Sequence, residues 1–123
     1  MNLVTLSAEI VELIHHDVIS SGELEGRALD KSLEDALALV DNRLAYGLVE
    51  DIFDLVAHTA EAIAQGHCFN DGNKRTAFRS LYAGLGLNGL EPDFETEVIA
   101  DKIIFLAQSK LSAEDLAAWL RDQ

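Results

Sequence analysis

Apolar residues recur at the three- and four-residue spacing of amphipathic helices in six stretches of the chain, which short polar segments separate. The pattern therefore predicts an all-α fold, a single compact six-helix domain over residues 1–123. The predicted helices cover residues 6–22, 32–40, 51–66, 74–89, 96–109 and 112–122.

Polar residues and glycines mark the expected ends of these helices. Ser7, Ser32, Thr96 and Ser112 stand where an N-cap side chain accepts a hydrogen bond from the first turn. Gly66 is placed as the residue that follows the third helix, a position that favours glycine. Short connections between well-marked ends are typical of a helical bundle.

Two segments are less regular. Residues 42–50 either extend the third helix or form an extended loop before it. In the first helix, His15 and His16 are adjacent and share no face, so we expect surface or capping roles for them and no metal site. The apolar stripe predicted to face inward there consists of Leu6, Ile10, Leu13, Ile14 and Val18.

Composition narrows the class of protein. The 123 residues are 49% hydrophobic, which is enough for a packed core despite a formal net charge of −13. One cysteine, no leader-like N-terminus and no apolar run of membrane-spanning length predict a soluble, cytoplasmic protein with no membrane partner. The acidity also speaks against direct binding of nucleic acid, which needs a lysine- and arginine-rich surface.

The few positive charges are unevenly placed. Three of the nine lysines and arginines lie between positions 74 and 79, and two of these, Lys74 and Arg75, belong to the stretch HCFNDGNKRTAF at residues 67–78. Cations in the first turn of a helix are locally unfavourable, because the helix dipole is positive there. Their presence points to an anionic ligand that compensates.

The same stretch has the parts of a phosphate site. Gly72 permits a tight turn and a close approach of ligand to backbone. Asn73 is expected to be the N-cap of a helix whose unpaired N–H groups, together with Lys74 and Arg75, bind phosphate.

Asp71 and His67 add chemistry to this site. A carboxylate beside phosphates is well placed to hold Mg²⁺. An imidazole that titrates near neutral pH can take a proton from an attacking hydroxyl. The combination suggests phosphoryl or nucleotidyl transfer; the alternative is a turn, a helix cap and solvated cations.

Residues 67–75, HCFNDGNKR, resemble the signature of the Fic/Doc superfamily, H-x-F-x-[DE]-G-N-G-R-x-x-R. Lys74 replaces a glycine of that pattern and Phe78 replaces its last arginine, and lysine at this position is typical of the Doc (death-on-curing) branch. Residues 15–37 resemble the N-terminal part of Doc proteins. The resemblance therefore extends over nearly the whole chain and implies the six-helix Fic/Doc fold.

The resemblance implies a function as well. His67 would be the general base, and Asp71 would hold Mg²⁺ on the phosphates of ATP. Residues 42–50 would be a short flap before the central helix, on which an extended segment of the target docks. Doc proteins are toxins that phosphorylate a threonine of elongation factor Tu and are neutralised by a Phd-like antitoxin. The phosphate-binding residues would be Gly72, Asn73, Lys74 and Arg75.

Two other functions stay open at this stage. One is AMP transfer of the Fic type, against which Lys74 and Phe78 argue. In Fic enzymes the glycine at the position of Lys74 leaves room for the nucleotide, and the arginine at the position of Phe78 binds the distal phosphates. The other is a silent binding module.

Gln65 stands where Doc proteins often have a basic residue, for which Arg79 is a candidate replacement. Residues 21–26, SGELEG, also match a short self-inhibitory pattern of Fic enzymes, which a glycine turn explains better.

Overall fold

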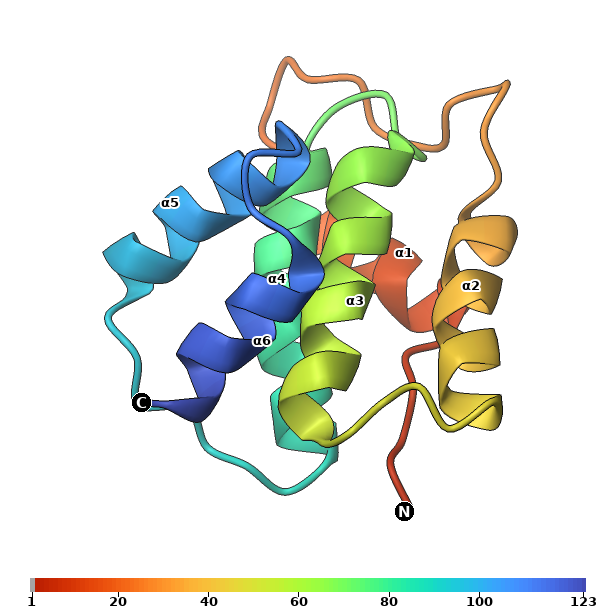
Figure 1. Ribbon diagram of the computed structural model, residues 1–123. Coiled ribbons are helices and arrows are strands. Elements are labelled where there is room, and N and C mark those ends of the chain that lie inside the picture. Colours follow the sequence, from red (N-terminus) through yellow and green to blue (C-terminus); the bar gives the residue numbers. More distant parts are fainter. Residues whose placement is uncertain (1) are drawn as a thin grey trace.

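The computed structural model describes residues 2–123, and within them it contains six helices and no strand (Figure 1). This confirms the predicted all-α fold. None of the helices in residues 2–123 is long and apolar enough to cross a membrane. The helices are α1 (Ala8–Val18), α2 (Leu33–Ala45), α3 (Ile52–Gly66), α4 (Asn73–Leu87), α5 (Thr96–Ala107) and α6 (Ala113–Arg121).

Helix α3 is the centre of the molecule, in contact with α2, α4, α5 and α6 (Figure 1). Eight of its fifteen residues are buried, including the unbroken run at 55–60. Because α3 is covered on several sides, it has little exposed face. His58 is one of these buried residues and is only 4% exposed. The buried helix provides a rigid support for the residues that follow it.

Helices α3 and α4 pack closely at Gly84. A Cβ atom at this position would lie 2.8 Å from Val56 Cγ1, which is closer than real Cβ atoms approach a neighbour. Glycine is therefore required here for contact between the helices, because any larger side chain would push them apart.

The buried face of α1 differs from the prediction by about one residue. Val11 and His15 are buried, whereas Leu13 is 67% exposed. One residue corresponds to a rotation of about 100° around the helix. The predicted surface role of His15 is thus wrong: its side chain lies between α1, α4 and the loop after α3.

Of the four serine and threonine residues predicted as N-caps, three are confirmed. The side chains of Ser7, Ser32 and Ser112 accept hydrogen bonds from the backbone N–H three residues later. Thr96 is instead the first residue of α5, after an N-cap without a side-chain bond. Gly66 is the last residue of α3, and the left-handed position after the helix belongs to His67.

Segment 42–50 agrees with neither of its two predicted forms over its full length. Residues 42–45 continue α2, so the helix before the segment is extended, not the one after it. The flap expected before the central helix is reduced to the connection at 46–51. The cause is local: the Leu44 side chain continues the apolar spacing of α2 and packs against the small cluster of Val40, Val49 and Leu55.

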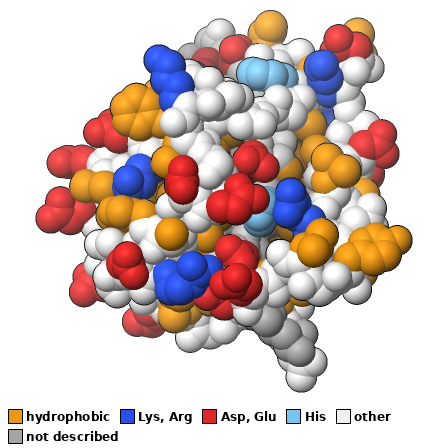
Figure 2. Space-filling model, viewed as in Figure 1, with side chains coloured by type: hydrophobic (Ala, Val, Ile, Leu, Met, Phe, Trp, Pro, Cys, Tyr) orange, Lys and Arg blue, Asp and Glu red, His pale blue; other side chains and the backbone are white. Residues whose placement is uncertain are grey.

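Two loops lie together at the end of the molecule opposite the termini, namely segment 19–32 and the loop at 67–72 (Figure 1). They are joined by backbone hydrogen bonds, from Ala28 N–H to the Cys68 carbonyl (2.8 Å) and from Asn70 N–H to the Gly26 carbonyl (3.0 Å). The loop that carries the predicted site is therefore bound to segment 19–32 at two backbone positions. Red Asp and Glu side chains are spread across the molecular face in Figure 2.

Candidate active site

His67 stands directly after the buried helix α3 with a left-handed backbone (φ 49°, ψ 40°). This conformation is rare for residues other than glycine, and such strain concentrates at functional sites. The imidazole is exposed, and no group in residues 2–123 is hydrogen-bonded to it. The backbone thus ends α3 and leaves the ring free for a ligand or substrate.

Asn73 has a different structural role from the one predicted. The N-cap of α4 is Gly72, in a left-handed conformation with φ 77°, and Asn73 is the first helical residue. The Asn73 side chain accepts from Phe69 N–H (3.1 Å) and donates to the Phe69 carbonyl (2.9 Å). It therefore clamps the loop to the helix, and no side chain caps the first N–H groups of α4.

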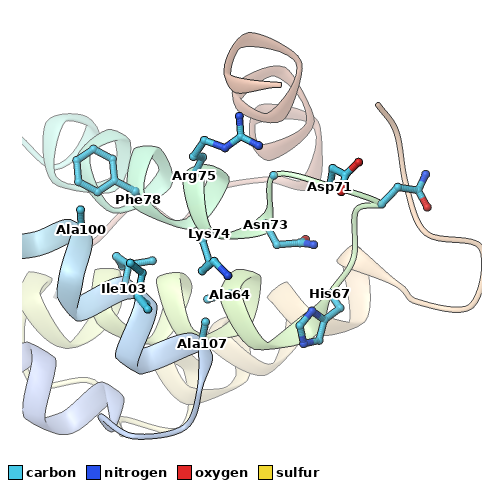
Figure 3. A pocket seen from close by; sticks show the side chains of 13 residues that line it. Ala64, His67, Asp71, Asn73, Lys74, Arg75, Phe78, Ala100, Ile103 and Ala107 are labelled. Carbon is cyan, nitrogen blue, oxygen red and sulfur yellow. The ribbon is translucent and has the colours of Figure 1, made fainter. Parts of the chain in front are cut away.

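These N–H groups border a cavity of about 550 Å³ that contains every residue predicted for the site. Its polar residues come from the loop at 67–72 and the first turn of α4. Its opposite wall is apolar, formed by Phe78 and by α5 (Figure 3). The cavity thus combines an anion-binding end with an apolar wall. The α5 residues are Ala100, Ile103, Ile104 and Ala107.

The two adjacent cations have different environments. Lys74 extends into the cavity towards the side on which His67 lies (Figure 3), and no acidic side chain in the described chain is in ion-pair distance of it. Arg75 points towards α1 and donates to the Val18 carbonyl (3.0 Å), to Ser20 Oγ (3.1 Å) and to the carboxylate of Glu23. Lys74 is therefore the free cation of the cavity.

Asp71 has one carboxylate oxygen engaged and one available. Its Oδ2 accepts from Leu24 N–H at 2.8 Å, and its Oδ1 has no partner within residues 2–123. No group of three or more potential metal ligands occurs in the described residues. This donor set fits Mg²⁺, which is commonly held by one or two carboxylates together with substrate phosphates and water. Asp71 alone would hold it.

Segment 19–32 covers the site from one side. Hydrogen bonds from Arg75 and from the Ser20 backbone lower the pKa of Glu23 to about 2, and Glu23 in turn raises that of Arg75. Glu25, the glutamate of the SGELEG pattern, contacts His16 Nδ1 at 2.6 Å and no cation of the site. The self-inhibitory role suggested by that pattern therefore has no contact that supports it.

Comparison with known proteins agrees with the geometry. Residues 5–83 match the Fic/DOC family. The chain belongs to the Fic/DOC family. It is 33% identical over 113 residues to "Protein kinase doc" of Escherichia phage P1, across 92% of this chain and 89% of that protein. It is also 28% identical over 116 residues to "Toxin Doc" of Mycolicibacterium smegmatis, with 88% and 89% covered. Both relatives are Doc proteins, which confirms the predicted branch.

The departures from the Fic/DOC pattern have structural counterparts. Gln65 donates to the Leu106 carbonyl at the end of α5 (2.9 Å), so it fastens α5 to α3. Arg79, the candidate replacement for a basic residue at position 65, is not among the residues that line the cavity. Cys68 is buried, which raises the pKa of its thiol and makes it a poor nucleophile.

The sequence analysis did not identify His15 and Thr76, two residues that support the loop at 67–72. His15 stacks on Phe69 with a centroid distance of 3.9 Å and an interplanar angle of 12°. Its Nδ1 lies 3.2 Å from Thr76 Oγ1 in the second turn of α4. The spacing of Val11 and His15 was the available signal, because residues four apart share a helix face.

Proposed function

We propose that this protein is a Doc-type toxin that transfers the γ-phosphate of ATP to a threonine hydroxyl of elongation factor Tu. The observation that carries the proposal is that His67, Asp71, Lys74 and the open N-terminus of α4 border one cavity. Phosphoryl transfer depends mainly on positioning and on electrostatic stabilisation, and these groups supply both. The name of the phage P1 relative, a protein kinase, supports the same reaction.

The pair Lys74 and Phe78 supports phosphate transfer over AMP transfer. Lys74 occupies the place of a glycine in the Fic pattern and extends into the cavity, which reduces the room for a nucleotide in the Fic orientation. Phe78 joins the apolar wall and offers no positive charge to distal phosphates. ATP would then bind with its γ-phosphate towards His67 and the target hydroxyl.

The proposed step is a direct displacement at phosphorus. The threonine hydroxyl gives its proton to the imidazole of His67, and its oxygen forms a bond to the γ-phosphorus. The bond from the γ-phosphorus to the bridging oxygen breaks, and ADP leaves. Lys74 and the first N–H groups of α4 stabilise the phosphate charge. When bound at Asp71, Mg²⁺ supplies further neutralisation of the phosphate oxygens.

Intact-mass measurement of elongation factor Tu after incubation with this protein, Mg²⁺ and ATP tests the reaction. A gain of about 80 Da, lost in His67→Ala and Asp71→Asn, is the expected result for one phosphoryl group. A gain of about 329 Da would correspond to AMP and would overturn the interpretation of Lys74. An unchanged mass would refute this target for the enzyme.

A second test concerns toxicity and its control. The relative named Toxin Doc supports a toxin function, and a toxin of this branch would be held inactive by a Phd-like antitoxin. Expression of the chain should arrest growth, and His67→Ala should abolish the arrest while the fold is kept. Normal growth with the wild type, or equal arrest with His67→Ala, would contradict the toxin kinase.

A further inference from the structure

His15 is a buried titratable side chain that directly contacts the loop of the proposed phosphate site. It is 2% exposed and comes from α1, yet its partners belong to three other segments. Its ring stacks on Phe69, its Nδ1 meets Thr76, and its Nε2 accepts from Gly26 N–H at 3.4 Å. Contacts at both ring nitrogens and on the ring face fix the orientation of the imidazole.

The hydrogen bonds determine the tautomer of the ring. The hydroxyl of Thr76 donates its single proton to the Gly72 carbonyl at 2.8 Å. At its contact with His15 the same oxygen must therefore accept, so Nδ1 carries the proton and Nε2 carries the lone pair that faces Gly26. Protonation of Nε2 would set two N–H donors against each other. The ring is satisfied only as the neutral Nδ1–H form.

The electrostatic surroundings favour this neutral form. Burial is the main influence and lowers the pKa of His15. Glu25 and Glu23 from segment 19–32 raise it, whereas Arg75 from α4 and His16 on the same helix lower it further.

The contacts of His15 with Gly72, Phe69 and Thr76 connect it to the proposed phosphate site. The ring covers the underside of Gly72, where an added Cβ would lie 3.5 Å from His15 Cε1. Phe69, on which the ring stacks, is the residue whose backbone Asn73 clamps. The hydroxyl of Thr76 links the ring to the Gly72 carbonyl at the first turn of α4. The imidazole thus joins the loop and the N-terminus of α4 from below.

We propose that His15 is a positioning residue, which holds the 69–73 loop and the first turn of α4 in the geometry that binds phosphate. It acts by donating through Nδ1 to Thr76 and by accepting at Nε2 from Gly26. It touches no reacting atom. This inference rests on the proposed function, since the ligand that it positions for is the phosphate chain of ATP.

The main test is the affinity for ATP and Mg²⁺, measured by calorimetry in the His67→Ala background so that no turnover occurs. His15→Phe keeps a ring for the stack and removes both hydrogen bonds. We expect it to weaken binding about 10- to 100-fold, as removal of a supporting hydrogen-bond partner does at metal sites. His15→Asn, which keeps an N–H donor at the position of Nδ1, should recover part of the affinity.

Two matched controls separate positioning from simple stability. His16→Phe changes the exposed neighbour on the same helix, and His58→Phe changes a histidine that is equally buried but lies away from the cavity. Both should leave the affinity for ATP unchanged. Should His15→Phe fail to fold, Thr76→Val removes the hydroxyl that accepts from His15 Nδ1 and is expected to show the same loss of affinity.

Nitrogen NMR of the wild type adds a readout that is independent of ATP. We expect His15 to be neutral at pH 7, with the proton on Nδ1. A proton on Nε2, or affinity in both His15→Phe and Thr76→Val within twofold of the reference, would overturn the inference while the proposed function stands. A reference protein that does not bind ATP would refute both, because no phosphate site would remain for His15 to position.

Discussion

His67 occupies a left-handed conformation that glycine would adopt with less strain, so catalysis and stability should conflict at this position. A residue with a Cβ pays about 1–2 kcal/mol in this region. Glycine relieves that strain but loses about 0.5–1 kcal/mol through greater freedom of the unfolded chain. The expected net gain of His67→Gly over His67→Ala is therefore about 0.5–1 kcal/mol.

This free energy corresponds to a measurable shift in melting temperature. At ~2.1 cal/mol/K per residue, the 123-residue chain has an unfolding entropy of about 0.26 kcal/mol/K. His67→Gly should thus melt about 2–4 °C above His67→Ala by differential scanning calorimetry, and neither should transfer phosphate.

Ser109 provides a matched control, because it is the other non-glycine residue with positive φ (58°) in the described chain. Ser109→Gly should raise the melting temperature by a similar amount and leave phosphate transfer intact. If His67→Gly melts at or below His67→Ala while Ser109→Gly is stabilised, the strain assigned to His67 is refuted.

Three further outcomes are expected. Asn73→Asp keeps the acceptor of the loop clamp but loses its donor, which should cost about 0.5–1.5 kcal/mol in urea unfolding and slow phosphate transfer. Glu23 has its pKa lowered to about 2, so its bond to Arg75 stabilises the fold above the ordinary value of 4.5 and is lost as pH falls towards 2. The melting temperature of wild type should therefore fall more steeply over that interval than that of Glu23→Gln, and parallel curves would contradict this. Gly84→Ala should destabilise by about 1–3 kcal/mol through its clash with α3. Gly86→Ala, whose Cβ meets nothing within 4 Å, should be neutral or stabilising, and equal losses in both would refute the close packing.

The sequence alone identified much of the site because its residues are consecutive. His67, Asp71 and the four residues that follow Asp71 lie within one turn and one helix start, so their proximity needs no tertiary contact. The serine caps were predictable for the same reason, since each bonds to a group three residues away. Local chemistry of this kind is readable from the order of the residues.

Periodicity alone was less reliable where a helix is covered on several sides. The inward face of α1 was misplaced by one residue, and the spacing of apolar residues in α3 did not indicate that this helix is buried on several sides. In both cases the neighbouring helices decide which side is covered, and that choice is absent from the pattern of a single segment. Segment 42–50 was misjudged because Leu44 packs onto the small cluster of Val40, Val49 and Leu55, which forms only when α2 and α3 pack together.

The amino-acid sequence by itself determined the helical class, the loop that carries the site and the chemical groups within it, because these follow from spacing and residue type over a few positions. Only the tertiary structure decided which groups are free and which are held. It fastened Arg75 to segment 19–32, left Lys74 in the cavity and placed His15 beneath Gly72. The contacts of Arg75 and of His15 join residues more than fifty positions apart, so they arise only when the helices pack.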